Sequence, residues 1–206
     1  TIRDEYQDSE LSHLAKQIIE QTDRTSKILQ SLVNFAHAGT DKSHYETEIV
    51  SILECMEEAK TLISLDKKSK DLDYSFDCEP NAKFIGDSQR FLQVLVNLIS
   101  NAKDASQANN KISLRAWVEG DQVRVDVVDE GIGIPVAIRD RVFDPFFTTK
   151  EPGEGTGLGL SLVFSIVEDL GGNIDIISPV NKSKGTGTQV ILRFPCYHSD
   201  TLEVSK

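Results

Sequence analysis

The chain has 206 residues, of which 39% are hydrophobic and 27% charged, a balance that supports a buried core in one large domain or in a domain with an appendage. Its net charge of −11 argues against nucleic acid and against an anionic membrane surface as partners, because both attract basic surfaces. The three cysteines lie far apart without a CxxC pair, and no run of 18 apolar residues occurs, so we expect a reduced, cytoplasmic chain without a membrane span.

A long amphipathic helix is predicted at the start of the chain. Residues from about 4 to 38 contain no proline or glycine, and apolar side chains follow a spacing of three and four residues. A single helix cannot bury such a seam, so we expect a partner helix or a second subunit. The stretch "AGTDKSH" then ends the helix and leads into a linker at 41–46. The seam consists of Leu11, Leu14, Ile18, Ile28, Leu32 and Phe35, with Gln21 and Thr25 completing the register.

The remaining chain alternates between strand and helix patterns, and it predicts one domain at 47–196 with a tail at 197–206. A hairpin is expected to turn at Gly120-Asp121, and residues 131–156 have an irregular pattern. This order predicts an α+β fold, a two-layer α/β sandwich with a mostly antiparallel sheet. Helices are expected at 51–68, 88–108 and 159–170, and strands at 45–50, 72–76, 83–86, 111–119, 122–130, 173–178 and 187–194.

Two asparagines stand out on the helix predicted at 88–108. Asn97 and Asn101 in "NLISNAKDA" are four residues apart and therefore share one face of a largely apolar helix. One interpretation is that they are exposed or act as caps. The other is that their amide oxygens bind a hard cation such as Mg²⁺, together with the phosphates that it carries.

A carboxylate is predicted at the end of a strand, in "DEGIGIP". Asp129 follows alternating residues and precedes Gly131 and Gly133. The segment could simply be a turn. Alternatively, a group that only accepts hydrogen bonds, beside a backbone kept open by glycines, could receive the amino group of adenine.

Two adjoining stretches in the irregular region complete the pattern. In "FDPFFTTK" (143–150), the phenylalanines are either ordinary core residues or part of a hinged lid, which we expect at about 136–156. In "GEGTGLGLSL" (153–162), the glycines either form a flexible linker or let backbone N–H groups approach a polyphosphate at the start of a helix. Neither the Walker pattern nor the dinucleotide-binding GxGxxG pattern matches this stretch.

Together and in this order, over residues 45–195, these stretches resemble the ATP-binding module of the GHKL superfamily, and most of all that of two-component sensor histidine kinases. "NLISNAKDA" is similar to the N box, "DEGIGIP" and "GTGLGL" to the two glycine boxes, and "FDPFF" to the F box. "QTDRTSKILQSLVNFAHAG" resembles the second helix of the dimerisation and histidine-phosphotransfer domain, which assigns residues 1–40 to it. The run from Phe146 to Gly172 is most similar to the nitrogen-regulation branch.

The resemblance implies a GHKL (Bergerat) fold and a protein-histidine kinase that uses ATP and Mg²⁺. Asn101 would ligate Mg²⁺ beside Asn97, Asp129 would hold the adenine amino group, and Lys150 would reach the γ-phosphate, although an exposed lysine is the competing interpretation. The other implied nucleotide contacts are Lys103, Gly131, Gly133, Ile134, Phe143, Phe147, Gly155, Thr156, Gly157, Leu158, Gly159, Leu160 and Thr188.

The implied partners are a response-regulator receiver domain, a histidine-bearing helix and, in the full-length protein, a second copy in a homodimer. No nucleic acid and no direct membrane contact of this fragment are expected. Its cytoplasmic location would also suit the cytoplasmic portion of an inner-membrane sensor.

The sequence departs from the family pattern in two places. Many members carry Lys or Arg, then Phe or Tyr, where this chain has Asp104 and Ala105, so a basic phosphate contact from this helix is in doubt unless Lys103 replaces it. The phosphoacceptor is also missing, because His13, His37, His44 and His198 lack its context. We therefore expect that the isolated chain cannot phosphorylate itself and that the acceptor helix lies outside it.

Three other functions compete with histidine phosphorylation. Hydrolysing GHKL ATPases place Glu where Asn97 stands, and an amide cannot take a proton from water, so Asn97 favours transfer over hydrolysis. A non-catalytic nucleotide-binding interaction module would not need the intact asparagines, Asp129 and glycines. An anti-sigma-type serine kinase would lack the long first helix.

Overall fold

The computed structural model describes residues 11–19, 21–22, 25–26, 29, 33, 47–65, 71–151 and 155–198. The described residues before 34 are helical, as predicted, and Leu11, Leu14 and Ile18 of the apolar seam are 51–66% exposed. No helix in the described part of the chain has both the length and the apolar character to cross a membrane. The rest of the seam (Ile28, Leu32 and Phe35), the linker at 41–46 and the tail beyond residue 198 lie outside the described residues.

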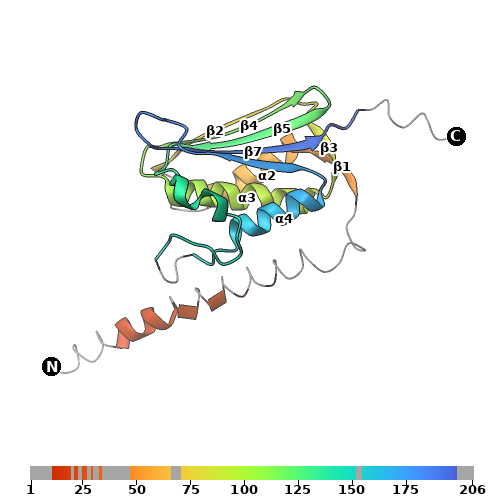
Figure 1. The fold of residues 1–206 in the computed structure, drawn as a ribbon. Helices are drawn as coiled ribbons and strands as arrows, with labels where there is room; N and C mark the ends of the chain where they lie inside the picture. Colours follow the sequence, from red (N-terminus) through yellow and green to blue (C-terminus); the bar gives the residue numbers. More distant parts are fainter. Residues whose placement is uncertain are drawn as a thin grey trace, which may run out of the picture.

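The domain has two layers, with a five-stranded sheet on one side and three helices on the other (Figure 1). The strand order is β2-β4-β5-β7-β6; β2 and β4 are parallel and the other neighbours antiparallel, so the predicted sandwich with a mostly antiparallel sheet is confirmed. Strands β1 and β3 form a separate antiparallel pair. The bounds are β1 Glu48–Ser51, α2 Ile52–Ser64, β2 Asp73–Cys78, β3 Lys83–Gly86, α3 Ser88–Ala105, β4 Lys111–Glu119, β5 Gln122–Asp129, the 3₁₀ helix η3 Val136–Arg141, α4 Gly159–Asp169, β6 Asn173–Ile177 and β7 Thr188–Pro195.

Helix α3 lies at the centre of the helical layer and positions the site. It begins after Asp87, whose carboxylate accepts a hydrogen bond from the Arg90 backbone N–H at 3.0 Å, as expected of an N-cap residue. Apolar residues on three of its turns, among them Phe91, Leu95 and Leu98, are buried against the sheet. The polar positions Asn97 and Asn101 are left on the side that meets α4, which packs along α3.

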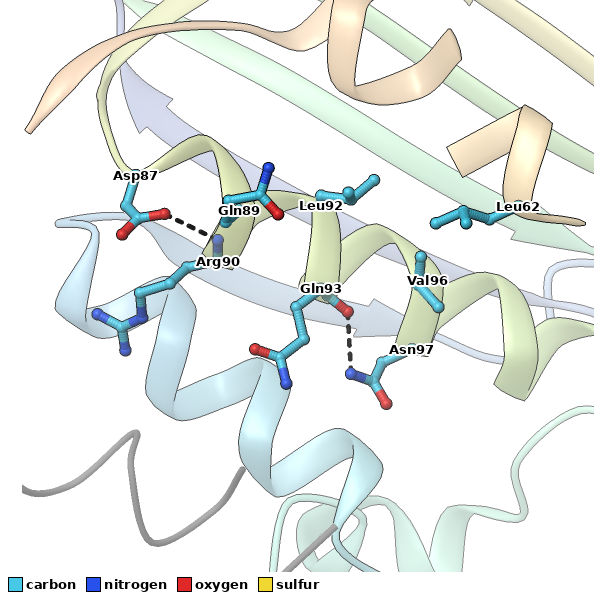
Figure 2. Close-up of a pocket in the computed structure, with 8 residues that line it drawn as sticks. All are labelled: Leu62, Asp87, Gln89, Arg90, Leu92, Gln93, Val96 and Asn97. Atoms are coloured by element: carbon cyan, nitrogen blue, oxygen red, sulfur yellow. Dashed lines mark hydrogen bonds between the residues drawn. The ribbon is translucent and has the colours of Figure 1, made fainter. Parts of the chain in front are cut away.

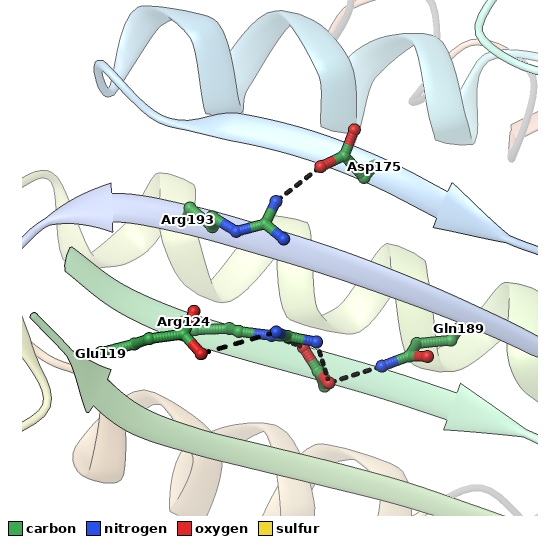
Figure 3. Close-up of polar contacts among 6 residues, drawn as sticks. Glu119, Arg124, Asp175, Gln189 and Arg193 are labelled. Atoms are coloured by element: carbon green, nitrogen blue, oxygen red, sulfur yellow. Dashed lines mark hydrogen bonds and ion pairs between the residues drawn. The ribbon is translucent and has the colours of Figure 1, made fainter.

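The outer face of the sheet carries a polar network (Figure 3). Asp126 accepts two hydrogen bonds from Arg124, at 2.8 and 3.1 Å, and one from the Gln189 amide at 2.6 Å. Because side chains alternate along a strand, Asp126 and Asp129, three residues apart on β5, point to opposite faces of the sheet. The Asp126 side chain thus lies on the outer face of the sheet, and the Asp129 side chain faces the helical layer.

Candidate functional site

The predicted motifs meet at one end of the helical layer. The loop that follows β5 lies on the last turn of α3, where the Ile132 N–H donates to the Ala105 carbonyl at 3.0 Å. A Cβ on Gly131 would lie 2.5 Å from that carbonyl oxygen and 2.9 Å from the Ala105 Cβ. Glycine at 131 is therefore required for the close approach of β5 and α3, and it packs against the small side chain at 105.

Asp129 forms one end of the site. The side chain is 7% exposed, and its Oδ1 accepts hydrogen bonds from the backbone N–H groups of Gly131, at 2.8 Å, and Thr188, at 3.2 Å. Burial raises the pKa of Asp129, while these two hydrogen bonds act in the opposite direction. Both bonds from the described residues go to Oδ1, which leaves Oδ2 as an acceptor for a ligand.

Ser178 supports this end of the site, and the sequence motifs do not include it. It is 2% exposed; its hydroxyl accepts from the Ile134 N–H at 2.7 Å and donates to the Gly187 carbonyl at 2.9 Å. Gly133 has a φ of +75°, and a Cβ there would lie 3.2 Å from the Ser178 hydroxyl. Ser178 thereby connects the segment that follows β5 to the start of β7 through hydrogen bonds. No local pattern marks Ser178, because it lies 44 residues from its partner.

The two asparagines form the other end. A Cβ on Gly159, the first residue of α4, would lie 3.6 Å from both the Asn97 Oδ1 and the Asn101 Nδ2. Asn97 donates to the Gln93 carbonyl at 2.9 Å, whereas the Asn101 Nδ2 is buried and has no partner among the described residues. Helix α4 begins without a side-chain cap. An orphaned amide thus faces the uncapped N–H groups of a helix N-terminus, an arrangement that an anion can satisfy.

The glycine loop before α4, residues 155–158, packs against the segment that precedes it in the chain. Gly157 has a φ of +66°, and a Cβ there would lie 2.3 Å from the Phe146 carbonyl carbon. A Cβ on Gly155 would lie 2.5 Å from the Thr148 hydroxyl. Gly157 therefore allows two backbone segments to touch, and Gly155 leaves room for the side chains of Thr148 and Lys150, packing roles that the sequence alone does not indicate. Within the same loop, the Thr156 hydroxyl accepts from the Leu158 N–H at 3.3 Å, the Leu158 side chain is buried, and Leu160 packs against the core.

The predicted lid contains η3 and the phenylalanine cluster. The ring of Phe143 packs on Phe164 of α4, with 5.3 Å between centroids, and the Arg141 guanidinium lies 4.6 Å from the Phe147 ring centroid. Phe146 is 64% exposed and has a φ of +68°. The segment is thus attached to α4 through Phe143 and presents Phe146 to solvent.

The two candidate lysines have different surroundings. The Lys150 ammonium contacts the carboxylate of Asp104, on the last turn of α3. Lys103 lines a hollow of about 270 Å³ with Asp71 and Gln107, and neither the glycines nor Asp129 border it. The structure thus places Lys150 beside α3 and the glycine loop, and Lys103 at a hollow that Asp104, the partner of Lys150, also lines.

A larger groove, of about 530 Å³, runs along α3 beside Leu62 of α2 (Figure 2). Gln93 and Asn97 border it toward α4, and Leu62 of α2 and Val96 close it on the opposite side. Of the predicted site residues only Asn97 lines this groove, so the groove adjoins the site and does not contain it.

Comparisons with known proteins agree with this arrangement. Residues 86–198 match the family model of histidine kinase-, DNA gyrase B- and HSP90-like ATPases. The chain is 32% identical over 187 residues to sensor histidine kinase ZraS of Escherichia coli strain K12, covering 90% of this chain and 38% of ZraS. It is 33% identical over 193 residues to sensor kinase CckA of Brucella abortus, covering 85% of this chain and 20% of CckA. The chain therefore spans well under half the length of these relatives.

Solved structures show the same relationship. The catalytic domain of histidine kinase ThkA superposes with a TM-score of 0.65 at 33% identity, covering 73% of this chain and 96% of that domain. ThkA in complex with the response regulator TrrA gives a TM-score of 0.69 at 26% identity, covering 87% of this chain and 49% of the ThkA chain. With the matched family model covering over half of its residues, the chain belongs to the histidine kinase-, DNA gyrase B- and HSP90-like ATPase family, and it carries the ATP-binding domain of that family in the form found in sensor histidine kinases.

Proposed function

We propose that this chain is the ATP-binding, phosphoryl-donating core of a sensor histidine kinase. It would transfer the γ-phosphoryl group to a histidine on a helix outside this chain, for relay to an aspartate of a response regulator. The observation that carries the proposal is the position of Asn97 and Asn101, both facing Gly159 at the uncapped start of α4. An amide at position 97 cannot take a proton from an attacking water, which favours transfer over hydrolysis.

Adenine recognition is assigned to Asp129. Its Oδ2 would accept the exocyclic amino group, because Oδ1 already accepts from Gly131 and Thr188. Gly133 and Ile134, which Ser178 holds in place, would line the base. A guanine presents a carbonyl oxygen at the equivalent position, where a carboxylate would repel it.

The residues present also fit Mg²⁺. The Asn101 Oδ1 lies 3.8 Å from where a Cβ on Gly159 would stand, at the start of α4, and carboxamide oxygens suit this cation. In the described part of the chain, no cluster of three or more His, Cys, Asp or Glu side chains could hold a metal by itself, so nucleotide phosphates would supply the other ligands. Bound Mg²⁺ would neutralise charge on those phosphates.

The remaining contribution of the chain is to position the nucleotide phosphates and to place positive charge beside them. Phosphoryl transfer depends mainly on alignment and electrostatic stabilisation, without a covalent enzyme intermediate. The backbone N–H groups of Gly157 and Gly159 and the start of α4 would bind phosphate oxygens, and Lys150 would reach the γ-phosphate. Phe143 and Phe147 would anchor the lid over the nucleotide.

The proposed partners follow from the relatives. ThkA forms a complex with the response regulator TrrA, and by analogy this chain would act with a receiver domain. Its first helix, with the exposed Leu11, Leu14 and Ile18, would pair with the histidine-bearing helix and with a second copy in the full-length protein. Such a kinase core would lie in the cytoplasm.

The test uses the purified chain, labelled ATP, Mg²⁺ and the histidine-bearing helix of the same protein added separately. We expect acid-labile, base-stable label on the added helix, no label on the chain alone, and loss of labelling in Asn101→Ala. Rapid phosphate release by the chain alone would indicate an ATPase instead. Nucleotide binding without label on the helix would indicate a non-catalytic module.

A further inference from the structure

The contact between Asp104 and Lys150 joins the lid to helix α3. Asp104 lies three residues after Asn101, one helical turn further along α3, and its carboxylate contacts the Lys150 ammonium. The side chains of Lys150 and Asp104 are 35% and 40% exposed.

The rest of Lys150 is also held in place. Its backbone N–H donates to the Thr148 hydroxyl at 3.2 Å. A Cβ on Gly155 would lie 3.2 Å from the Lys150 Cβ and 3.0 Å from its Cδ, so the aliphatic stem lies on the glycine loop. The side chain therefore runs from the glycine loop to α3, the two elements that border the phosphate end of the site.

We propose that Asp104 is a positioning residue that holds the Lys150 ammonium at the phosphate end of the site and so favours nucleoside triphosphate over diphosphate. The inference rests on the proposed function. An ammonium has three N–H donors, and one hydrogen bond to Asp104 leaves two for a γ-phosphate oxygen. A carboxylate so close to the phosphates would repel them if it stood alone, and the pair with Lys150 removes that charge. The acidic residue of α3 thus does not supply a phosphate contact itself but directs one from the lid.

The test measures affinity for Mg²⁺-ADP and for a non-hydrolysable Mg²⁺-ATP analogue by calorimetry, using the whole chain. The variants are Asp104→Ala, Asp104→Glu, Lys150→Ala and the double alanine variant. The matched control is Asp77→Ala, which removes an exposed ion pair with Arg115, 3.3 Å long, on the outer face of the sheet.

We expect Lys150→Ala to lower triphosphate affinity about tenfold or more with little change for the diphosphate, as for loss of a charge-assisted hydrogen bond. Asp104→Ala should lower the triphosphate-to-diphosphate affinity ratio by about two- to fivefold, the effect of one partly exposed ion pair. Asp104→Glu should keep most of the affinity ratio of the unaltered chain, and Asp77→Ala should not change that ratio. The double variant should lose no more triphosphate affinity than Lys150→Ala alone.

Three results would overturn the inference: an unchanged ratio in Asp104→Ala, a raised ratio, which would mean that Asp104 competes with the phosphate, or additive losses in the double variant. If the unaltered chain bound neither nucleotide, the proposed function itself would fail. The two failures are therefore distinguishable.

Discussion

Replacing Asp129 with asparagine should separate nucleotide recognition from folding. The asparagine Oδ1 can still accept from the Gly131 and Thr188 N–H groups, but an N–H₂ group replaces Oδ2 and faces the adenine amino group as a second donor. Loss of one charge-assisted hydrogen bond at a side chain that is 7% exposed costs about 1.5–3 kcal/mol, roughly a 10- to 150-fold loss of affinity for ATP. Because burial already disfavours the charge and raises the pKa of Asp129, the free energy of unfolding should change by less than about 1 kcal/mol.

The matched control is Asp126→Asn on the same strand. Asp126 is equally buried but faces the outer side of the sheet, where it pairs with Arg124. This variant should lower the free energy of unfolding by about 1.5–3 kcal/mol and leave ATP affinity unchanged. Calorimetric titration with ATP and with GTP, together with urea unfolding, measures both quantities. Unchanged ATP affinity in Asp129→Asn, or an equal loss in Asp126→Asn, would refute the assignment of Asp129 to adenine.

Three further predictions concern packing, the lid and pH. Gly131→Ala should lower the free energy of unfolding by about 1–3 kcal/mol and weaken ATP binding, because the new Cβ would lie 2.5 Å from the Ala105 carbonyl oxygen. The control Gly120→Ala, at a position with open space around it, should leave ATP affinity unchanged in the same titration. Limited proteolysis should cut the proposed lid at 136–156 without nucleotide and more slowly with a Mg²⁺-ATP analogue; equal cutting would contradict a mobile lid. Since burial raises the pKa of Asp129 above its usual 3.8, the stability of the unaltered chain relative to Asp129→Asn should be highest below about pH 3.8 and should fall as pH rises through the folded-state pKa. Urea unfolding of both chains across pH measures this difference.

Local sequence patterns determined most elements of the fold. Strands β3 and β4 have the predicted bounds, and the β4–β5 hairpin turns at Gly120, whose φ is +64°. These features depend on alternation and turn chemistry within a few residues, which a single sequence displays directly. Helix α3 ends at Ala105, three residues before the predicted end, because the Ser106 backbone is extended.

Pairing between distant segments could be read only from the tertiary structure. The parallel β2–β4 pair and the separate β1–β3 sheet join strands with other elements between them, so no local pattern specifies them. The same holds for Ser178, whose hydroxyl bonds to a backbone 44 residues away.

In the candidate site, too, some features could be read from the sequence and others required the tertiary structure. The order of the four motifs, and the choice of residue types that suit a nucleotide, were evident from the chain alone. The ion pair between Asp104 and Lys150, and the contacts of Gly155 with Thr148 and of Gly157 with Phe146, emerged only when α3, the lid and the start of α4 were placed together. The physical reason is that a side chain's charge state, partner and burial depend on which distant segments surround it, whereas helix and strand periodicity depends on near neighbours in sequence.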